Sequence, residues 1–198
     1  MSTEQLLSLA GFVVVMVGTP GPNNLMLMAS GVNFGLRRSV PHLVGIAFGC
    51  QALLLAAAFG LGQVLALYPS AVIILRVLSA AFLGYMAWLL LSTRTAPESD
   101  TNASHPMRFW QATLFQWVNP KAWLICLALV ATHTDPHHLA VTTAWASLVF
   151  LLIGVPIMVA WTAGGMVMKT WLQTGERLLW FNRLMALLLV ASLYPIIA

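Results

Sequence analysis

A single lysine stands inside a long apolar run that contains no acidic residue. Lys121 follows Asn119-Pro120 near the middle of the run 109–132. At ~1.5 Å per helical residue, about ten residues on either side span roughly 15 Å each, which is half of a hydrocarbon core. A cation at that depth costs about 2.5–3.5 kcal/mol on insertion scales. Two interpretations stay open: Lys121 binds a transient anion such as a substrate carboxylate, or it bonds backbone carbonyls freed nearby.

Several amide side chains also fall inside apolar runs. They are Asn23, Asn24, Gln51, Gln116 and Asn119. Amides can bind the ammonium or carboxylate group of a small zwitterion, but they equally satisfy open backbone groups or bond across helices. These five residues and Lys121 are our candidate substrate-binding residues. We expect no catalytic residue, no metal ligands and no cofactor.

Prolines interrupt two of the apolar runs next to these candidate residues. Pro20, Gly21 and Pro22 break the first run, and Pro120 breaks the fourth. Proline removes a backbone donor and clashes with the preceding helical turn, yet it is favoured as the first residue of a new helix. Asn119 is a good N-cap for such a helix. Each break therefore predicts a fresh half-helix whose free N–H groups and partial positive charge can hold a carboxylate near the bilayer midplane.

The composition shows what surrounds these residues. Of 198 residues, 60% are hydrophobic and only 7% are charged, whereas a soluble domain carries about 25% charged residues. Runs of about 20 apolar residues are long enough to cross a bilayer. Six such runs occur, at 6–31, 41–67, 71–91, 109–132, 139–166 and 178–197. The sequence predicts an all-α integral membrane protein with six transmembrane helices and no soluble domain.

The two breaks divide the chain into similar halves. Pro22 and Pro120 are 98 residues apart in a chain whose half-length is 99. Each half reads as one broken helix followed by two helices, and an odd number of spans inserts the second half upside down. This pattern predicts a single transporter domain over 1–198, built from two inverted three-helix repeats at about 1–92 and 109–198. Paired interrupted helices point to a transporter's binding site.

The positions of the basic residues predict the orientation. Seven lie on one side if there are six spans: Arg37, Arg38, Arg94, Arg108, Lys169, Arg177 and Arg183. Only Arg76 lies on the other side. By the positive-inside rule the central loop, 93–108, is cytoplasmic and both termini are outside. The basic residues form no clustered patch, so the net charge of +4 does not indicate nucleic-acid binding. Because no Lys or Arg precedes Arg37, we expect the first apolar run to remain in the mature protein.

The motif Thr19–Asn24, with sequence TPGPNN, resembles the signature of the LysE/RhtB family of bacterial amino-acid exporters. The spacing of Gly35, Arg37, Gly45 and Gly49, the Gly84-Tyr85 pair and the NPKA segment at 119–122 are similar to that family too, so the likeness covers essentially the whole chain. The resemblance implies proton-coupled export of small amino acids or their derivatives across the bacterial cytoplasmic membrane. Many members have an acid where this chain has Asn23, and PGPNN is similar to the branch that exports cysteine and O-acetylserine.

Three other functions remain as alternatives. Related six-helix folds carry electrons on cysteine pairs, and this chain has Cys50 and Cys126, although neither lies in the first span. A passive channel would give flux that does not depend on a proton gradient. A membrane enzyme is the third alternative, but no catalytic motif supports it. Small residues on the helices are also compatible with a homodimer.

Overall fold

The structure of the chain is a computed structural model that describes residues 2–61, 63, 67–92, 105–172 and 176–192. Within these ranges the protein is helical and has no strand, which confirms the predicted all-α class. The elements are α1 (Thr3–Gly18), α2 (Pro22–Ala56), η1 (Ala57–Leu61), α4 (Pro69–Ser92), α5 (Phe109–Val118), α6 (Pro120–His133), η2 (Pro136–His138), α7 (Leu139–Val149), η3 (Phe150–Gly154), α8 (Val155–Leu172) and α9 (Arg177–Ala191). Most of the predicted central loop, 93–104, lies outside the described residues.

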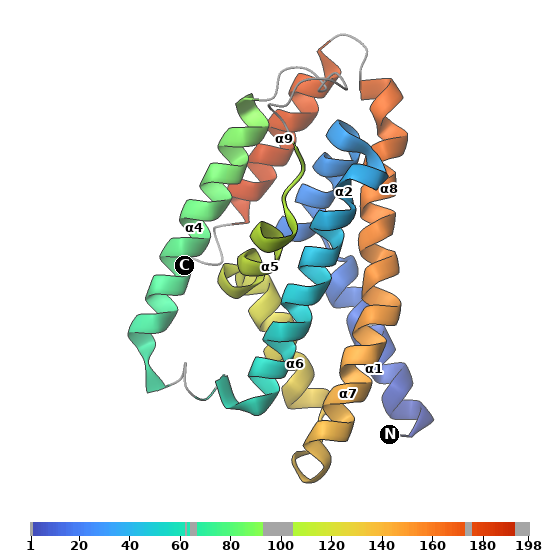
Figure 1. Cartoon of the computed structure of the whole chain (residues 1–198), viewed down its shortest axis with the longest axis vertical. Helices are drawn as coiled ribbons and strands as arrows, with labels where there is room; N and C mark the ends of the chain where they lie inside the picture. Colours follow the sequence, from blue (N-terminus) through green and yellow to red (C-terminus); the bar gives the residue numbers. More distant parts are fainter. Residues whose placement is uncertain (1, 62, 64–66, 93–104, 173–175, 193–198) are drawn as a thin grey trace.

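Helix α2 is a hairpin of two helical arms. Its 35 residues would make a straight rod of about 50 Å, far longer than the ~30 Å of a hydrocarbon core. Gly35 leaves the helical conformation at φ 77° and ψ 170°, and the chain reverses there. A positive φ is accessible to glycine at little cost. Figure 1 shows α2 turning back on itself at the upper end of the molecule.

Both predicted breaks interrupt helices in the structure. Helix α1 ends at Gly18 and α2 begins at Pro22, while α5 ends at Val118 and α6 begins at Pro120. The α5–α6 pair is bent by 68°. In both cases proline is the first residue of the new helix, as expected from its fixed φ and missing N–H.

Three helical stretches of the described chain are long and apolar enough to cross a membrane. They are Pro22–Leu61, Ser70–Ser92 and Pro136–Leu172, and the bent α5–α6 pair makes a fourth if it is counted as one span. Helix α1 is apolar but has only 16 residues. The third stretch contains η3, a π-helical turn just before Pro156. The sequence gives no signal for this change of helix type.

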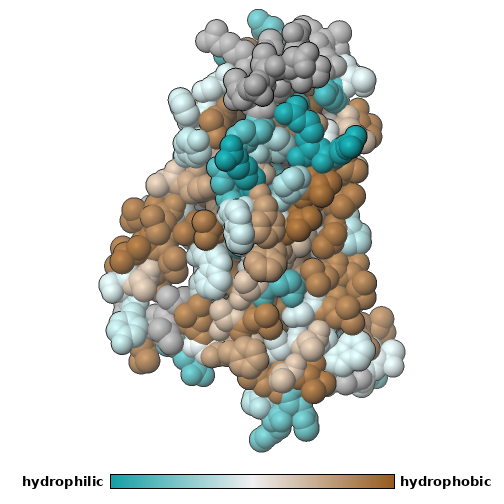
Figure 2. Space-filling model, in the orientation of Figure 1, coloured by the Kyte–Doolittle hydropathy of each residue, from teal (hydrophilic) through white to brown (hydrophobic). Residues whose placement is uncertain are grey.

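The outer surface is apolar over most of its height. Figure 2 shows hydrophobic residues covering the middle of the molecule, with hydrophilic residues gathered toward its ends. Large side chains such as Leu7, Ile73, Trp88, Val167 and Leu187 are each at least 60% exposed. An apolar surface this large is suited to contact with lipid rather than with water.

Glycines let α2 approach two neighbouring helices closely. A Cβ added to Gly45 or Gly49 would collide with the backbone of α5, at Phe109 and Thr113 respectively. A Cβ on Gly31 would collide with Thr162 of α8 in the same way. Helix association in membranes depends on such small residues. Gly45 and Gly49 therefore serve close packing, and α2 is the central element of the bundle.

Candidate functional site

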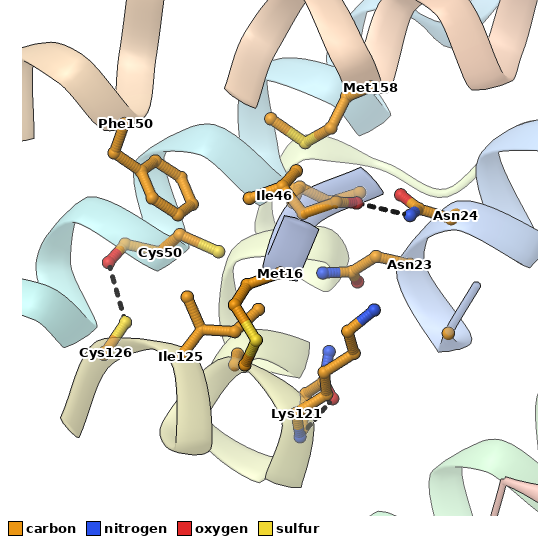
Figure 3. Close-up of a pocket in the computed structure, with 14 residues that line it drawn as sticks. Met16, Asn23, Asn24, Ile46, Cys50, Lys121, Ile125, Cys126, Phe150 and Met158 are labelled. Atoms are coloured by element: carbon orange, nitrogen blue, oxygen red, sulfur yellow. Dashed lines mark hydrogen bonds between the residues drawn. The ribbon is translucent and has the colours of Figure 1, made fainter. Parts of the chain in front are cut away.

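The two breaks border one small cavity inside the bundle. It is lined by Met16, Val17, Gly21, Asn23, Asn24, Ile46, Cys50, Asn119, Lys121, Ala122, Ile125, Cys126, Phe150 and Met158. These residues come from α1, both arms of α2, α6, η3 and α8, as well as from the two breaks. Figure 3 shows the Lys121 ammonium beside Asn23 and Asn24 on one side of the cavity, and the two thiols on the other.

The Lys121 ammonium group contacts the broken end of α1. Its Nζ donates to the carbonyl oxygen of Thr19 at 2.6 Å, to Thr19 Oγ1 at 2.9 Å and to the Pro20 carbonyl at 3.3 Å. These acceptors lie just beyond the C-terminus of α1, where carbonyls lack helical partners and the helix dipole favours a cation. Of the two interpretations left open by the sequence, this conformation displays the one in which Lys121 bonds freed carbonyls.

Gly21 is what allows the lysine to lie across the break. A Cβ at this position would stand 2.7 Å from Lys121 Cδ and 3.0 Å from its Nζ. The backbone of Gly21 is fully extended at φ −179°, a conformation open to any residue. Glycine therefore leaves room for this position of the lysine side chain, while its backbone conformation does not require glycine.

Two buried asparagines satisfy backbone groups at the breaks. Asn24 Nδ2 donates to the carbonyls of Val17 at 2.7 Å and Thr19 at 2.9 Å. Asn119 Oδ1 accepts from the backbone N–H of Lys121 at 3.1 Å, which confirms it as the N-cap of α6. Both side chains are at most 3% exposed. The open helix ends that proline creates are thus partly closed by neighbouring amides.

A pair of amides joins the first break to the second broken helix. Asn23 Nδ2 donates to Gln116 Oε1 at 2.8 Å, and Gln116 Nε2 donates back to Asn23 Oδ1 at 3.1 Å. Gln116 is fully buried and also donates to the Ala112 carbonyl of its own helix. The start of α2 and the last turn of α5 are therefore tied together by reciprocal hydrogen bonds.

The structure brings five of the six candidate residues together and leaves one apart. Asn23, Asn24, Asn119 and Lys121 line the cavity, and Gln116 bonds to Asn23. Gln51 does not line it, and its amide instead lies 3.4 Å from the carbonyl of Ser147 on α7. Residue type alone could not distinguish Gln51 from the other five residues. Whether the Gln51 side chain reaches the cavity depends on which face of α2 lines it.

The wall opposite the amides is apolar and contains both cysteines. Cys126 Sγ lies 3.7 Å from the Cys50 carbonyl, and Cys50 Sγ lies 3.6 Å from Gln116 Oε1. Met16, Ile46, Ile125, Phe150 and Met158 form the rest of this wall. The cavity thus has a polar side rich in amides and one ammonium group, and an apolar side that contains sulfur.

The cavity is small in this conformation. Its volume of about 30 Å³ holds one or two water molecules. A small organic molecule would enter only if the surrounding helices moved apart.

Sequence analysis missed a second set of buried polar residues, between the cavity and the upper end of the molecule. Ser30, Asn33, Ser39, His42 and Asn182 are each at most 5% exposed. Ser30 and Ser39 hydrogen-bond to each other at 2.7 Å across the hairpin of α2. Polar residues at i, i+3 spacing within an apolar run, here Ser39 and His42, were the available signal.

Comparisons with known proteins agree on one family. The family model described as LysE type translocator matches residues 14–192. The chain is 30% identical over 182 residues to proteins named cysteine/O-acetylserine efflux protein from Escherichia coli strain K12, E. coli O1:K1 / APEC and Shigella flexneri. Each alignment covers 90% of this chain and 90% of the relative. No solved structure gives a significant match.

Proposed function

Because this chain belongs to the LysE type translocator family, we propose that it exports small amino acids or their derivatives from the bacterial cytoplasm. A translocator of this family is a transporter and not an enzyme, and its apolar helices make it a multi-pass membrane protein. Relatives that match over 90% of their length are named for the efflux of cysteine and O-acetylserine. We place this chain's substrate in the same class of small zwitterions.

The two-sided cavity is the observation that carries this proposal. Lys121 is the cation for the substrate carboxylate, and the Asn23 and Asn24 amides bind the remaining polar groups of the zwitterion, with Asn119 and Gln116 supporting them. A short apolar or sulfur-containing side chain then faces Met16, Ile125 and Phe150. Because Lys121 holds neutral carbonyls at Thr19 and Pro20, an incoming carboxylate replaces weaker acceptors with a charged one.

The architecture that we propose has six crossings in two inverted three-helix repeats. Support comes from matching breaks: α1 and α2 meet at Pro20–Pro22, α5 and α6 meet at Asn119, and the two breaks touch through Lys121. The hairpin at Gly35 divides Pro22–Leu61 into parts of two crossings. Helix α1 with the first arm of α2 would form span one, and α9 would belong to span six.

Transport would proceed by alternating access driven by the proton gradient. The cavity of about 30 Å³ is too small for an amino acid, so we propose that this conformation lies between inward-open and outward-open states. The broken helices supply the flexible points about which the halves rock. A coupled exporter of this kind moves its substrate against a concentration gradient, which a passive channel cannot do.

We propose that the upper end of the molecule faces the cytoplasm. The hairpin of α2, the end of α8 and the start of α9 meet at this end in Figure 1, and their sequences carry Arg37, Arg38, Lys169 and Arg177. This concentration of cations supports both termini lying outside the bacterial inner membrane.

Replacement of Lys121 tests the site. In inside-out vesicles, Lys121→Met should reduce uptake of a small zwitterionic amino acid about 10- to 100-fold, because a charged hydrogen bond contributes about 1.5–3 kcal/mol. Asn119→Ala should also reduce uptake, since it removes the cap of α6. The measurement is the initial rate of labelled amino-acid uptake.

Lys169→Met is the matched control. Lys169 lies in the last turn of α8, outside the cavity, and its loss should leave uptake within about twofold of the unaltered protein. Normal uptake by both Lys121→Met and Asn119→Ala would show that the second break serves structure alone.

A further inference from the structure

A histidine is buried in the bundle without a hydrogen-bond partner for either ring nitrogen among the described residues. His42 lies in the second arm of α2 and is 1% exposed, and both Nδ1 and Nε2 lack partners. Burying a polar group without a partner is costly, and native proteins retain few such groups without a functional reason. The exporter account of the cavity gives this imidazole no role.

Helical spacing places His42 next to the cavity. Ile46 and Cys50 follow it at intervals of four residues on the same face of α2, and both line the cavity. The imidazole is therefore about one turn, ~6 Å along the axis, from the cavity wall. The side of α2 that carries Gly45 and Gly49 is pressed against α5, so His42 lies close to a tight helix contact.

Other buried polar groups continue from His42 toward the upper end of the molecule. Ser39 is one turn away from His42 and bonds to both Ser30 and the Gly35 carbonyl. Asn33 donates to the Ala29 carbonyl and to Asn182 of α9, while its own Oδ1 has no partner in the described structure. Together with His42 these residues make a polar route through an otherwise apolar part of the bundle.

The charged groups on the elements around α2 are almost all cations. Arg37 and Arg38 lie on α2 itself, Arg108 caps α5, Lys121 is on α6, Lys169 is on α8, and Arg177 and Arg183 are on α9. Glu176, the N-cap residue of α9, is the one carboxylate of the described residues among them, and it is exposed. The other titratable groups on these elements are Cys50, Cys126 and His133. Apart from Glu176, the described residues of these elements therefore include no carboxylate that could pair with an imidazolium.

From this placement we propose that His42 is the proton-binding residue that couples export to the proton gradient. In this conformation the ring is buried, and burial away from water disfavours the charged imidazolium ion. When the α2–α5 contact opens, water reaches the ring and a protonated form becomes stable. Proton binding thus favours an open state and proton release favours the closed one, which links the two equilibria.

The proton balance of one cycle is simple. One ring nitrogen takes a proton from water on the side of higher proton concentration and returns it to water on the other side. No bond of the substrate is made or broken. The inference rests on the proposed export function, because a proton site has this meaning only in a protein that moves substrate.

The test separates coupling from substrate movement. Purified protein in proteoliposomes is assayed in two ways with the same labelled amino acid: accumulation driven by an imposed proton gradient, and exchange between equal internal and external concentrations without a gradient. His42→Gln should lose at least about tenfold in gradient-driven accumulation while exchange stays within about threefold of the unaltered protein. His133→Gln, which removes a histidine at the end of α6, is the matched control and should retain both activities.

Each other outcome contradicts the inference at a different level. Gradient-driven accumulation that persists in His42→Gln would overturn the coupling role. Equal loss of exchange and accumulation in both His42→Gln and His42→Asn, with both variants eluting as folded monodisperse protein, would assign His42 to packing. Absence of exchange in the unaltered protein for every amino acid would overturn the proposed export function itself.

Discussion

At the scale of single residues, the site is already satisfied by its own groups. Lys121 donates hydrogen bonds to the carbonyls of Thr19 and Pro20, and Asn23 is hydrogen-bonded to Gln116. Polar groups without partners would destabilise the protein, so this pairing lowers the free energy of the empty site. We expect a substrate to take over some of these hydrogen bonds and so to loosen the contacts that join the two breaks.

The amide pair Asn23–Gln116 allows a quantitative test of this idea. Asn23→Leu and Gln116→Leu should each lower the rate of export, and the double variant should be no worse than the poorer single one, because both single changes break the same pair of bonds. The measurement is a double-mutant cycle on initial rates in vesicles. Strictly additive losses would show that the two amides act separately.

The sequence predicted which chemical groups the site contains better than it predicted which residues line the site. Lys121, Asn24 and Asn119 stood out because charged and amide groups are rare within apolar runs. Gln51 met the same criterion, yet it bonds to α7. His42 escaped notice although it also lies in such a run, because its significance depends on having no partner, which is a property of three-dimensional packing.

At the scale of elements, broken helices create the site and glycines hold them in place. Pro22 and Pro120 start new helices whose first N–H groups have no helical acceptor, and the neighbouring side chains complete the breaks. The second arm of α2 then lies against α5 through Gly45 and Gly49, with Thr113 Oγ1 donating to the Gly45 carbonyl at 3.1 Å. Movement of these two helices would open or close the cavity.

A glycine substitution tests the importance of this contact. Gly45→Ala should lower the thermal stability of the purified protein, since the added Cβ would meet the Phe109 carbonyl and lie 2.7 Å from Ala112 Cβ. Overpacking of this kind costs about 1–3 kcal/mol. Gly84→Ala on α4 is the control, because nothing lies within 4 Å of its Cβ. Equal unfolding temperatures for the two variants in detergent would argue against a tight α2–α5 contact.

Prolines and apolar runs made the elements largely predictable. They located both breaks, because proline is disfavoured in a helix interior and favoured in the first turn. Pro41, which lies inside α2, shows that proline alone does not end a helix. The π-helical turn η3 could not be predicted, since it arises from one extra residue accommodated within a continuous apolar helix. The apolar runs 6–31 and 41–67 predicted a connection between residues 31 and 41, and the structure makes the reversal at Gly35 within an otherwise helical segment.

At the scale of the whole molecule, the helix pairs α1–α2 and α5–α6 meet at one small cavity. Lys121 at the second break donates to the Thr19 and Pro20 carbonyls at the first, so a single cation joins the two breaks. An exporter built in this way needs no separate soluble domain, in agreement with an apolar outer surface and few charges.

The most direct test is uptake into inside-out vesicles that contain the purified protein, with a panel of labelled amino acids and with or without an imposed proton gradient. In this orientation uptake corresponds to cellular export. We predict saturable uptake of one or a few small neutral amino acids, accumulated above the external concentration only when the gradient is present. Equilibration without accumulation would indicate a channel, and no uptake of any amino acid by folded protein would contradict the assignment as an amino-acid exporter.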